Sequence, residues 1–306
     1  MKRNEKPDTV SGVLVIDKHT GVTSHRIVQI LRKLYDTPRV GHTGTLDPLA
    51  TGVLPVLIGR AVKASEFLLA SDKEYDATLR LGIATDTQDI TGTVLSVCED
   101  LPNAKEVQTA AAEFVGEIQQ LPPMYSAIKI GGRKLVDAAR AGETIERSPR
   151  PVQIHSIEIQ KNTREEYRLH VICSKGTYIR TLCADIGERL GCGATLTALR
   201  RTRSGIFDLS HAHTIEELEQ AAPAARASMV LPCDTLFSHC PALRLNDFQA
   251  KLIRGGTQLY QQKLKTDFPL GTRVRLYQNN VFFALGEVRE YGADGSAIKP
   301  IRLFVL

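Results

Sequence analysis

The spacing of hydrophobic residues along the first part of the chain predicts short strands separated by amphipathic helices. The β-branched run at 13–16 predicts a strand, and Thr23 or Ser24 can cap a helix whose apolar residues recur at helical spacing. Further strands are expected at 53–58, 74–81 and 91–97, and further helices at 61–69 and 105–117. The strand at 91–97 is predicted to form a hairpin with the strand at 74–81.

The pattern changes between residues 126 and 152, where two basic stretches flank a short helix: Gly131-Gly132-Arg133-Lys134 and Arg147-Ser148-Pro149-Arg150. This polar insertion interrupts a run of regular elements that resumes at residue 152. Strands are then expected at 152–160, 167–173 and 195–203, and helices at 178–190 and 214–221. Three prolines break the pattern after the last helix: Pro223, Pro232 and Pro241.

The residues from about Leu243 onward form a separate small unit in this pattern. One helix is expected at 247–254, stopped by Gly255-Gly256, and strands are expected at 272–277, 282–288 and 301–305. Strands and helices that do not alternate strictly indicate an α+β fold. We therefore predict a mixed-sheet core over 1–240 with an insertion at 126–152, followed by a mostly-β domain over 241–306.

Length and composition are those of an ordinary globular protein of about two domains, with 306 residues, 42% of them hydrophobic and 24% charged. No apolar run approaches the roughly 20 residues that a transmembrane helix needs. The chain lacks the apolar region of a signal peptide, so a cytoplasmic protein without a membrane partner is expected. The six cysteines contain no C-x-x-C pair, which argues against a disulfide framework and a cysteine zinc site.

Charge is distributed unevenly along the chain, although the net charge is only +5. Residues 241–306 contain ten basic and five acidic side chains, and the rest of the chain is balanced. A second basic region at 173–204 contains six basic and two acidic residues. Two basic regions on a neutral background suit a polyanionic partner such as a nucleic acid. A solvated basic face without a partner remains the alternative.

The stretch Gly41–Leu54, GHTGTLDPLATGVL, is the most unusual in the chain. Its glycines allow tight turns, and Pro48 stiffens the backbone next to Asp47. Such a loop can hold one carboxylate in a fixed, partly exposed position, although Asp47 can also simply cap a turn. The loop lacks the lysine of a P-loop and the spacing of a dinucleotide-binding motif. His42 with Asp47 is a weak metal-ligand pair, so no metal or cofactor is expected.

Gly41–Leu54 resembles the signature loop of the tRNA pseudouridine-55 synthases, a bacterial family with eukaryotic nucleolar relatives. Further stretches resemble that family in the same order, namely 12–18, 73–75, 173–180 and 191–201. The resemblance runs from about residue 12 to 206, and the tail resembles the RNA-binding PUA module. One departure is His19, which stands where the family usually has a proline that shapes a turn.

This resemblance implies roles for individual residues. Asp47 occupies the place of the catalytic aspartate, Arg180 that of its cationic partner, and Tyr75 that of a tyrosine lying against the target base. The remaining substrate-contacting positions are Lys18, His42, Tyr178, Ile179 and Leu199. The insertion at 126–152 resembles a mobile thumb that closes on RNA, with basic candidates Lys129, Arg133, Lys134, Arg147 and Arg150.

The implied activity is isomerisation of a uridine in the T-arm loop of tRNA to pseudouridine, without a cofactor. The N1–C1′ bond is broken and uracil is rejoined through C5, which requires a nucleophile such as a carboxylate. Asp47 can attack C1′ or C6 or assist formation of a glycal, and the sequence leaves these open. A monomer that needs no protein partner is expected. The alternatives are a tRNA-binding folding helper and a synthase for a guide-directed RNA.

Overall fold

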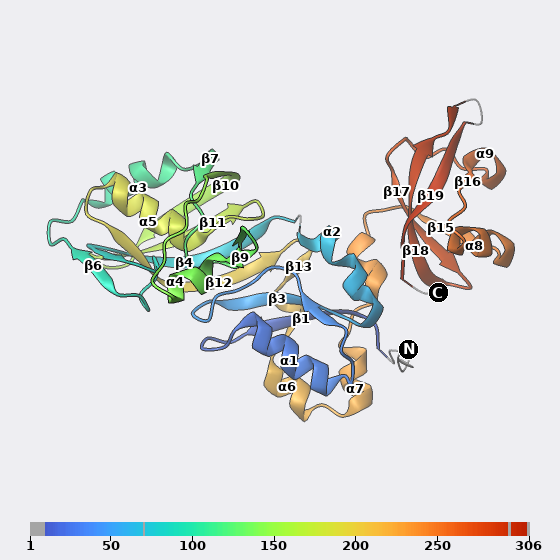
Figure 1. Cartoon of the computed structure of the whole chain (residues 1–306), viewed down its shortest axis with the longest axis horizontal. Coiled ribbons are helices and arrows are strands. Elements are labelled where there is room, and N and C mark those ends of the chain that lie inside the picture. Colours follow the sequence, from blue (N-terminus) through green and yellow to red (C-terminus); the bar gives the residue numbers. More distant parts are fainter. Residues whose placement is uncertain (1–9, 70, 293–294, 305–306) are drawn as a thin grey trace.

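The computed structural model describes residues 10–69, 71–292 and 295–304 and confirms an α+β architecture with two separate main sheets (Figure 1). Within these residues, the larger sheet has ten strands in the order β14-β1-β3-β12-β4-β11-β10-β7, with β13 beside β12 and β2 beside β3. Its strands are β1 Gly12–Lys18, β2 Val40–His42, β3 Thr51–Ile58, β4 Lys73–Leu81, β7 Gly116–Gln120, β10 Arg150–Lys161, β11 Glu166–Cys173, β12 Ala194–Ser204, β13 Phe207–Asp208 and β14 Ala212–His213.

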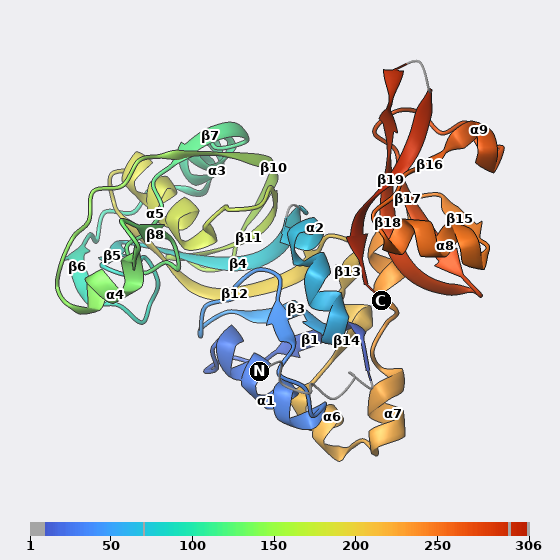
Figure 2. The same ribbon diagram turned by 45° about the vertical axis from the view of Figure 1, so that its right-hand side comes forward.

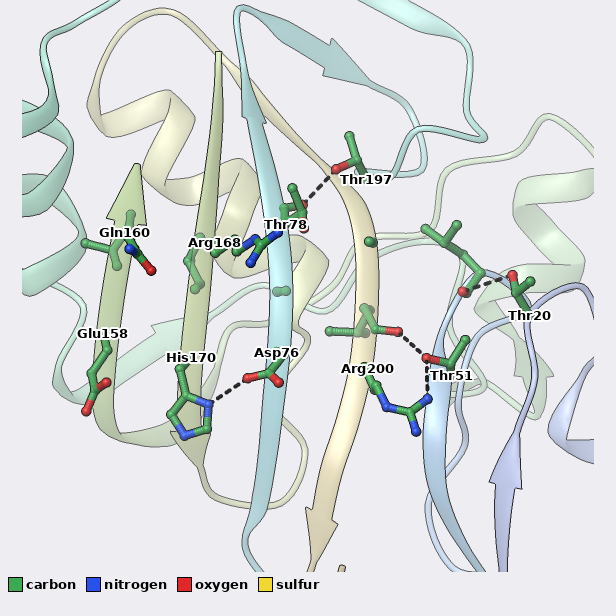
Figure 3. Close-up of a pocket in the computed structure, with 16 residues that line it drawn as sticks. Thr20, Thr51, Asp76, Thr78, Glu158, Gln160, Arg168, His170, Thr197 and Arg200 are labelled. Carbon is green, nitrogen blue, oxygen red and sulfur yellow. Dashed lines mark hydrogen bonds and ion pairs between the residues drawn. The ribbon is translucent and has the colours of Figure 1, made fainter. Parts of the chain in front are cut away.

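Helix α1 (Ser24–Leu34) and helix α5 (Ile179–Arg189) contribute to one hydrophobic core on the same face of this sheet. Thr23 caps α1 as predicted, because its hydroxyl accepts a hydrogen bond from the Arg26 amide at 3.1 Å. In β4, Tyr75 and Ala77 are buried on the helix-covered face. Asp76 points to the opposite face, as expected for alternating strand side chains (Figure 3).

Three predicted details of the first 240 residues are wrong. The strand β6 (Val94–Val97) pairs with β5 (Ile83–Thr85) and not with β4, because both edges of β4 are already occupied by β11 and β12. Helix α3 (Ala104–Ala112) ends earlier than residue 117, and β7 follows it. Pro223 begins helix α7 (Pro223–Ser228) instead of breaking the pattern, since the first helical turn needs no proline N–H.

The other predicted elements of the first 240 residues lie close to their expected positions. The segment at 61–69 begins as a 3-10 turn at Gly59–Ala64 and continues as α2 (Ser65–Leu69). Helix α6 (Ile215–Gln220) follows β14, and a further 3-10 turn lies at Cys233–Phe237. The insertion at 126–152 contains a small hairpin and a helix: β8 Lys129–Ile130, β9 Arg133–Lys134 and α4 Leu135–Arg140.

The C-terminal residues form a five-stranded sheet with its own core, in the order β15-β17-β18-β19-β16 (Figure 2). Its elements are β15 Ala242–Leu245, α8 Asp247–Arg254, β16 Leu259–Tyr260, α9 Gln261–Leu264, β17 Arg273–Gln278, β18 Val281–Glu290 and β19 Ser296–Leu303. The last strand therefore begins before residue 301, and the predicted end at Val305 lies outside the described residues.

Aromatic side chains join this C-terminal unit to the rest of the molecule. The rings of Phe237, Phe282 and Phe304 have centroids 5.1–5.9 Å apart, and Phe67 meets Phe237 edge-on at 5.2 Å. Lys63 adds a hydrogen bond of 2.9 Å to the Leu303 carbonyl. Because deletion of the unit would expose this cluster to water, substitutions on its surface are the better test of its role.

Candidate active site

The loop between β2 and β3 places Asp47 through a set of hydrogen bonds on both sides. The Thr43 amide donates to the Pro55 carbonyl at 3.1 Å, and the Leu46 amide donates to the Ser24 hydroxyl at 2.9 Å. After the aspartate, the Ala50 amide donates to the Asp47 carbonyl at 3.0 Å. The carboxylate is consequently carried by a braced backbone, as the turn residues of the loop predicted.

Asp47 and Arg180 form an ion pair, with 3.2 Å between Oδ2 and the guanidinium. Arg180 stands at the start of α5, and its side chain is only 6% exposed, whereas that of Asp47 is 38% exposed. The same guanidinium donates to the Tyr125 carbonyl, at the base of the thumb, at 2.5 Å. The buried Arg180 guanidinium is therefore fixed in place, and it holds an Asp47 carboxylate that remains partly exposed to solvent.

Burial and neighbouring charges act in opposite directions on the pKa of Asp47 and on the pKa of nearby Lys18. Burial raises the pKa of Asp47, while the positive charge of Arg180 opposes that rise and the carboxylate of Asp89 adds to it. Burial lowers the pKa of Lys18 to about 8, against the attraction of Asp47. Lys18 is fully buried and donates to the His19 carbonyl at 2.9 Å. Lys18 also donates to the Pro48 carbonyl at 3.5 Å, so it braces the loop next to Asp47.

Asp89 is a site residue that the sequence analysis did not identify. It is 6% exposed, and its Oδ2 lies 3.9 Å from the Arg180 guanidinium. Its other oxygen accepts hydrogen bonds from the Thr91 amide at 3.0 Å and the Thr87 hydroxyl at 2.9 Å. A single aspartate between threonines is typical of an ordinary turn, so the sequence held no signal for its place beside Arg180.

Tyr75 is buried in the floor of the site, opposite a second residue that the sequence analysis missed. Arg201, which is 1% exposed, is the register partner of Tyr75 on β12. Burial raises the pKa of Tyr75, and the Arg201 charge opposes this rise. Arg201 also donates to the carbonyls of Val53 at 2.7 Å and Gly44 at 3.2 Å. The Arg201 side chain thus joins β12 to both sides of the Asp47 loop.

The residues predicted to wall the uracil pocket lie at three distinct places. Tyr178 precedes α5, and the Arg180 guanidinium lies over its ring at 5.9 Å from the centroid. Ile179 is buried in the main core, and Leu199 is partly buried against the same core. Tyr178 is therefore beside the ion pair, while the contacts of Ile179 and Leu199 are those of packed core residues.

His42 and the turn at residues 18–21 flank the Asp47 loop. The Nδ1 atom of His42 is buried and has no hydrogen-bond partner among the described residues. Burial lowers the pKa of His42, so its neutral form is favoured. In the turn, the Gly21 amide donates to the Pro48 carbonyl at 2.8 Å and the Thr20 hydroxyl to the Leu49 carbonyl at 3.2 Å. His19 thus stands in a turn that still braces the Asp47 loop.

The basic residues of the thumb are not brought into contact with Asp47. Arg133 forms an ion pair with Glu143 within the thumb, and Arg147 donates to the Pro122 carbonyl at 2.8 Å. The three other predicted RNA-binding residues are exposed at the surface: Lys129, Lys134 and Arg150. Their side chains are therefore accessible to a large ligand, and within the described residues none of them forms an ion pair with Asp47.

A groove of about 750 Å³ lies on the face of the sheet that the helices do not cover, and Asp47 and Arg180 do not line it (Figure 3). It is lined by side chains such as Asp76, His170 and Arg200, which alternate with those that face the helices. Asp76 points toward His170 and pairs with it at 2.7 Å.

Among the described residues, no group of three or more metal-ligand side chains is assembled and no helix is long and apolar enough to cross a membrane.

Comparison with known proteins agrees with this arrangement. A family model described as TruB family pseudouridylate synthase (N terminal domain) matches residues 32–179, and one described as tRNA pseudouridylate synthase B C-terminal domain matches residues 180–238. The chain belongs to this family of pseudouridylate synthases, as predicted.

Its relatives include proteins named tRNA pseudouridine synthase B. The one from Aromatoleum aromaticum is 44% identical over 297 residues, covering 96% of this chain and 92% of that protein. The one from Alkaliphilus oremlandii is also 44% identical, covering 96% and 98%. The solved structure described as "Crystal Structure of a Cbf5-Nop10-Gar1 Complex" has a TM-score of 0.70 at 26% identity, covering 96% of this chain and 85% of that one.

Proposed function

We propose that this protein isomerises uridine 55 in the T-arm loop of tRNA to pseudouridine. The observation that carries the proposal is the Asp47–Arg180 pair, which holds a partly exposed carboxylate 3.2 Å from a buried guanidinium inside the family's signature loop. The names of the relatives, tRNA pseudouridine synthase B, support tRNA as the substrate. Membership in the family supports the isomerase activity.

In this proposal Asp47 is the nucleophile, and Arg180 keeps it ionised in spite of partial burial. The carboxylate displaces N1 from C1′, or adds to C6 before the N1–C1′ bond breaks, or assists loss of the base as a glycal forms. After rotation, C5 is joined to C1′, and Tyr75 shuttles the proton that leaves C5. Tyr178, Ile179 and Leu199 are proposed to enclose the uracil, and Lys18 to support the loop. None of these steps requires a metal or a redox cofactor.

A uridine stacked in the T loop can reach Asp47 only after it is flipped out of the loop. We propose that His42 packs against the RNA near the extruded nucleotide, which suits its unpartnered ring nitrogen and its neutral form. The thumb residues Lys129, Arg133, Lys134, Arg147 and Arg150 then contact the backbone. We further propose 1–240 as the catalytic domain, a monomeric enzyme in the cytoplasm, and 241–306 as a PUA-like RNA-binding domain.

Conversion of an isolated T-arm stem-loop tests the proposed substrate directly. Because the grooves of an A-form stem reveal little sequence, recognition should depend on the shape of the arm and on its splayed loop bases. A minimal T-arm stem-loop should be converted to pseudouridine, as mapped by base-specific chemistry on the unmodified transcript. A version with the same composition but a scrambled loop should not react. Equal conversion of unstructured uridine-containing RNA would contradict the proposal.

Exposed lysines of the C-terminal unit provide a second prediction. Lys251, Lys263 and Lys265 lie on or beside α8 and α9 and are exposed, so they can bind phosphates remote from Asp47. Replacing all three by glutamine should weaken tRNA binding. The slope of log K against log salt should fall by about 1 for each phosphate that the variant no longer neutralises. Single-turnover rates at saturating tRNA should not change.

The control for this substitution is the exposed lysine pair Lys105 and Lys161, replaced in the same way. The salt slope of that variant should equal the wild-type slope. A collapse of the single-turnover rate in the folded C-terminal variant, with an unchanged salt slope, would show that these residues serve the reaction and not the binding of RNA.

A further inference from the structure

Gln120 is a buried polar residue that the proposed chemistry does not yet use. It ends β7, the strand at one edge of the large sheet, and is only 1% exposed (Figure 1). Its side-chain oxygen accepts a hydrogen bond from the backbone N–H of Tyr178 at 2.7 Å, and its side-chain nitrogen donates to the Tyr178 carbonyl at 3.1 Å. Both polar atoms of this side chain are therefore used on the backbone of one residue at the start of α5.

This contact takes the place of a local cap on α5. Tyr178 is the cap residue of the helix, and it makes no side-chain capping hydrogen bond in the part of the chain that the structure describes. In a capping box, a glutamate or glutamine in the first turn bonds the N–H of the cap residue. The corresponding position of α5 is Thr181, whose hydroxyl donates instead to the Gln88 side chain at 2.7 Å. Gln120 bonds the Tyr178 N–H from another strand, so a tertiary contact fixes the first turn.

Arg180 is the second residue of that turn, and few contacts hold its guanidinium. One terminal nitrogen lies 3.2 Å from Asp47 Oδ2 and 3.9 Å from Asp89 Oδ2. The other terminal nitrogen donates to the Tyr125 carbonyl at 2.5 Å. The Nε atom of Arg180 is buried and has no hydrogen-bond partner among the described residues. The position of the guanidinium therefore depends strongly on its backbone, two residues after the contact with Gln120.

One short segment, residues 120–125, contacts the start of α5 at both of its ends. Its first residue, Gln120, holds the backbone of Tyr178, and its last residue, Tyr125, holds the guanidinium of Arg180. Pro122 and Pro123 lie between them and restrict the backbone of the segment. The segment therefore fixes the helix start and the catalytic cation relative to each other.

We propose that Gln120 is a positioning residue for the isomerisation, an inference that rests on the proposed function. It holds the Tyr178 backbone so that the guanidinium of Arg180 faces the Asp47 carboxylate. Without this contact the first turn of α5 loosens, and Arg180 no longer stays within ion-pair distance of Asp47. The nucleophile then loses the cation that keeps it ionised and aligned.

The first test removes the contact while it preserves the shape of the side chain. Gln120→Met loses both hydrogen bonds and keeps an unbranched side chain of similar length. In single-turnover reactions on a T-arm stem-loop, we expect the rate to fall by at least about tenfold, because a displaced catalytic group costs rate steeply. The Kd for the same RNA should stay near the wild-type value. A wild-type rate in a folded Gln120→Met variant would overturn the inference.

The matched control is Gln119→Met. Gln119 is the preceding residue of β7, and its side chain is exposed. The same chemical change at this position leaves the contact with Tyr178 intact. Gln119→Met should therefore react and bind as the wild type does.

The charges around Asp47 determine the pH at which it ionises. Its titratable neighbours are Arg180, Asp89, Lys18, Tyr75 and Tyr178. Burial raises the pKa of Asp47, and the Arg180 charge opposes this rise more than any other neighbour does. Burial also raises the pKa of both tyrosines, so they stay neutral at acidic and neutral pH. Displacement of Arg180 is therefore expected to raise the pKa of Asp47 further.

The pH profile of Gln120→Met separates positioning from a general loss of stability. We expect the pKa of Asp47 to rise by about one pH unit when the guanidinium moves away. The acid limb of the single-turnover rate should move to higher pH by the same amount, since the ionised carboxylate is the proposed nucleophile. A variant that reacts slowly with an unmoved acid limb has lost packing alone, and this result would contradict the inference.

Two further measurements need neither RNA nor activity. NMR titration of the Asp47 carboxyl carbon, assigned with Asp47→Asn, should show the higher pKa in Gln120→Met and the wild-type value in Gln119→Met. In the wild type, the Tyr178 amide should be protected from hydrogen exchange, which keeps the inference testable if Gln120→Met does not fold. An unprotected Tyr178 amide or an unchanged Asp47 pKa would overturn the inference. A wild-type enzyme that converts no uridine would instead refute the proposed function, while both of these measurements would still report on the contact.

Discussion

Asp47→Asn is expected to abolish pseudouridine formation while the protein remains folded and binds tRNA with near-normal affinity. Removal of a covalent nucleophile costs several orders of magnitude in rate, far more than the roughly tenfold effect of removing one hydrogen bond. The measurement is single-turnover conversion of a T-arm stem-loop, next to a binding isotherm on the same RNA. Near-wild-type conversion by Asp47→Asn would refute the assignment of the nucleophile.

The Tm of Asp47→Asn is a useful check, because the electrostatics of the site predict whether the substitution raises or lowers it. Burial raises the pKa of Asp47, so ionisation of this group opposes folding at pH values above its unfolded-state pKa. A neutral asparagine removes that opposition, and Arg180 keeps its bond to the Tyr125 carbonyl. The Tm of Asp47→Asn should therefore equal or exceed that of the wild type. A large loss of stability would mean that the missing activity reports unfolding.

This variant also separates the leading proposal from a folding helper that acts on tRNA by binding alone. A helper would need the thumb and the basic surfaces but not the carboxylate at position 47. Asp47→Asn should therefore retain any tRNA-folding activity while it loses the isomerase activity. Two activities that disappear together, in a folded variant with normal affinity, would show that remodelling of tRNA depends on the reaction.

The parts of the site that the sequence predicted are those encoded by local chemistry. Glycines, a proline and polar turn residues lie next to Asp47, and the loop they form is braced in the structure as expected. Helix α1 was predictable for the same reason, because its cap and its apolar stripe occur within one short stretch. The pairing of Asp47 with Arg180 followed from family resemblance and not from any pattern in the residues.

The parts that were missed depend on contacts between distant strands. Arg201 lies opposite Tyr75 because β12 pairs with β4 in a register that contains two irregularities, which no spacing in the sequence reveals. Asp89 reaches Arg180 because the turn between β5 and β6 is hydrogen-bonded to Leu196 of β12, a contact between segments far apart in the sequence. The predicted hairpin between 74–81 and 91–97 failed for a related reason, since β4 is a central strand with both edges occupied.

Tyr75→Phe is expected to bind tRNA normally but to release the C5 proton very slowly. In the proposed function the phenyl ring keeps the surface that lies against the base, while the hydroxyl that shuttles the C5 proton is removed. A positioned acid or base contributes roughly 10²–10⁴-fold to a rate, and we expect a loss of that size in single-turnover release of tritium from [5-³H]uridine.

The Tyr75→Phe experiment discriminates between chemistry and packing at a residue that is only 8% exposed. A packing role predicts full activity, because the ring and its buried contacts remain. A proton-transfer role predicts normal cleavage and rejoining of a 5-fluorouridine stem-loop, which has no C5 proton to lose, together with slow tritium release from the natural base. Slowing of both substrates by the same factor would place the Tyr75 hydroxyl at an earlier step, beside the Asp47 carboxylate, and would contradict the assignment of Tyr75 to the C5 proton.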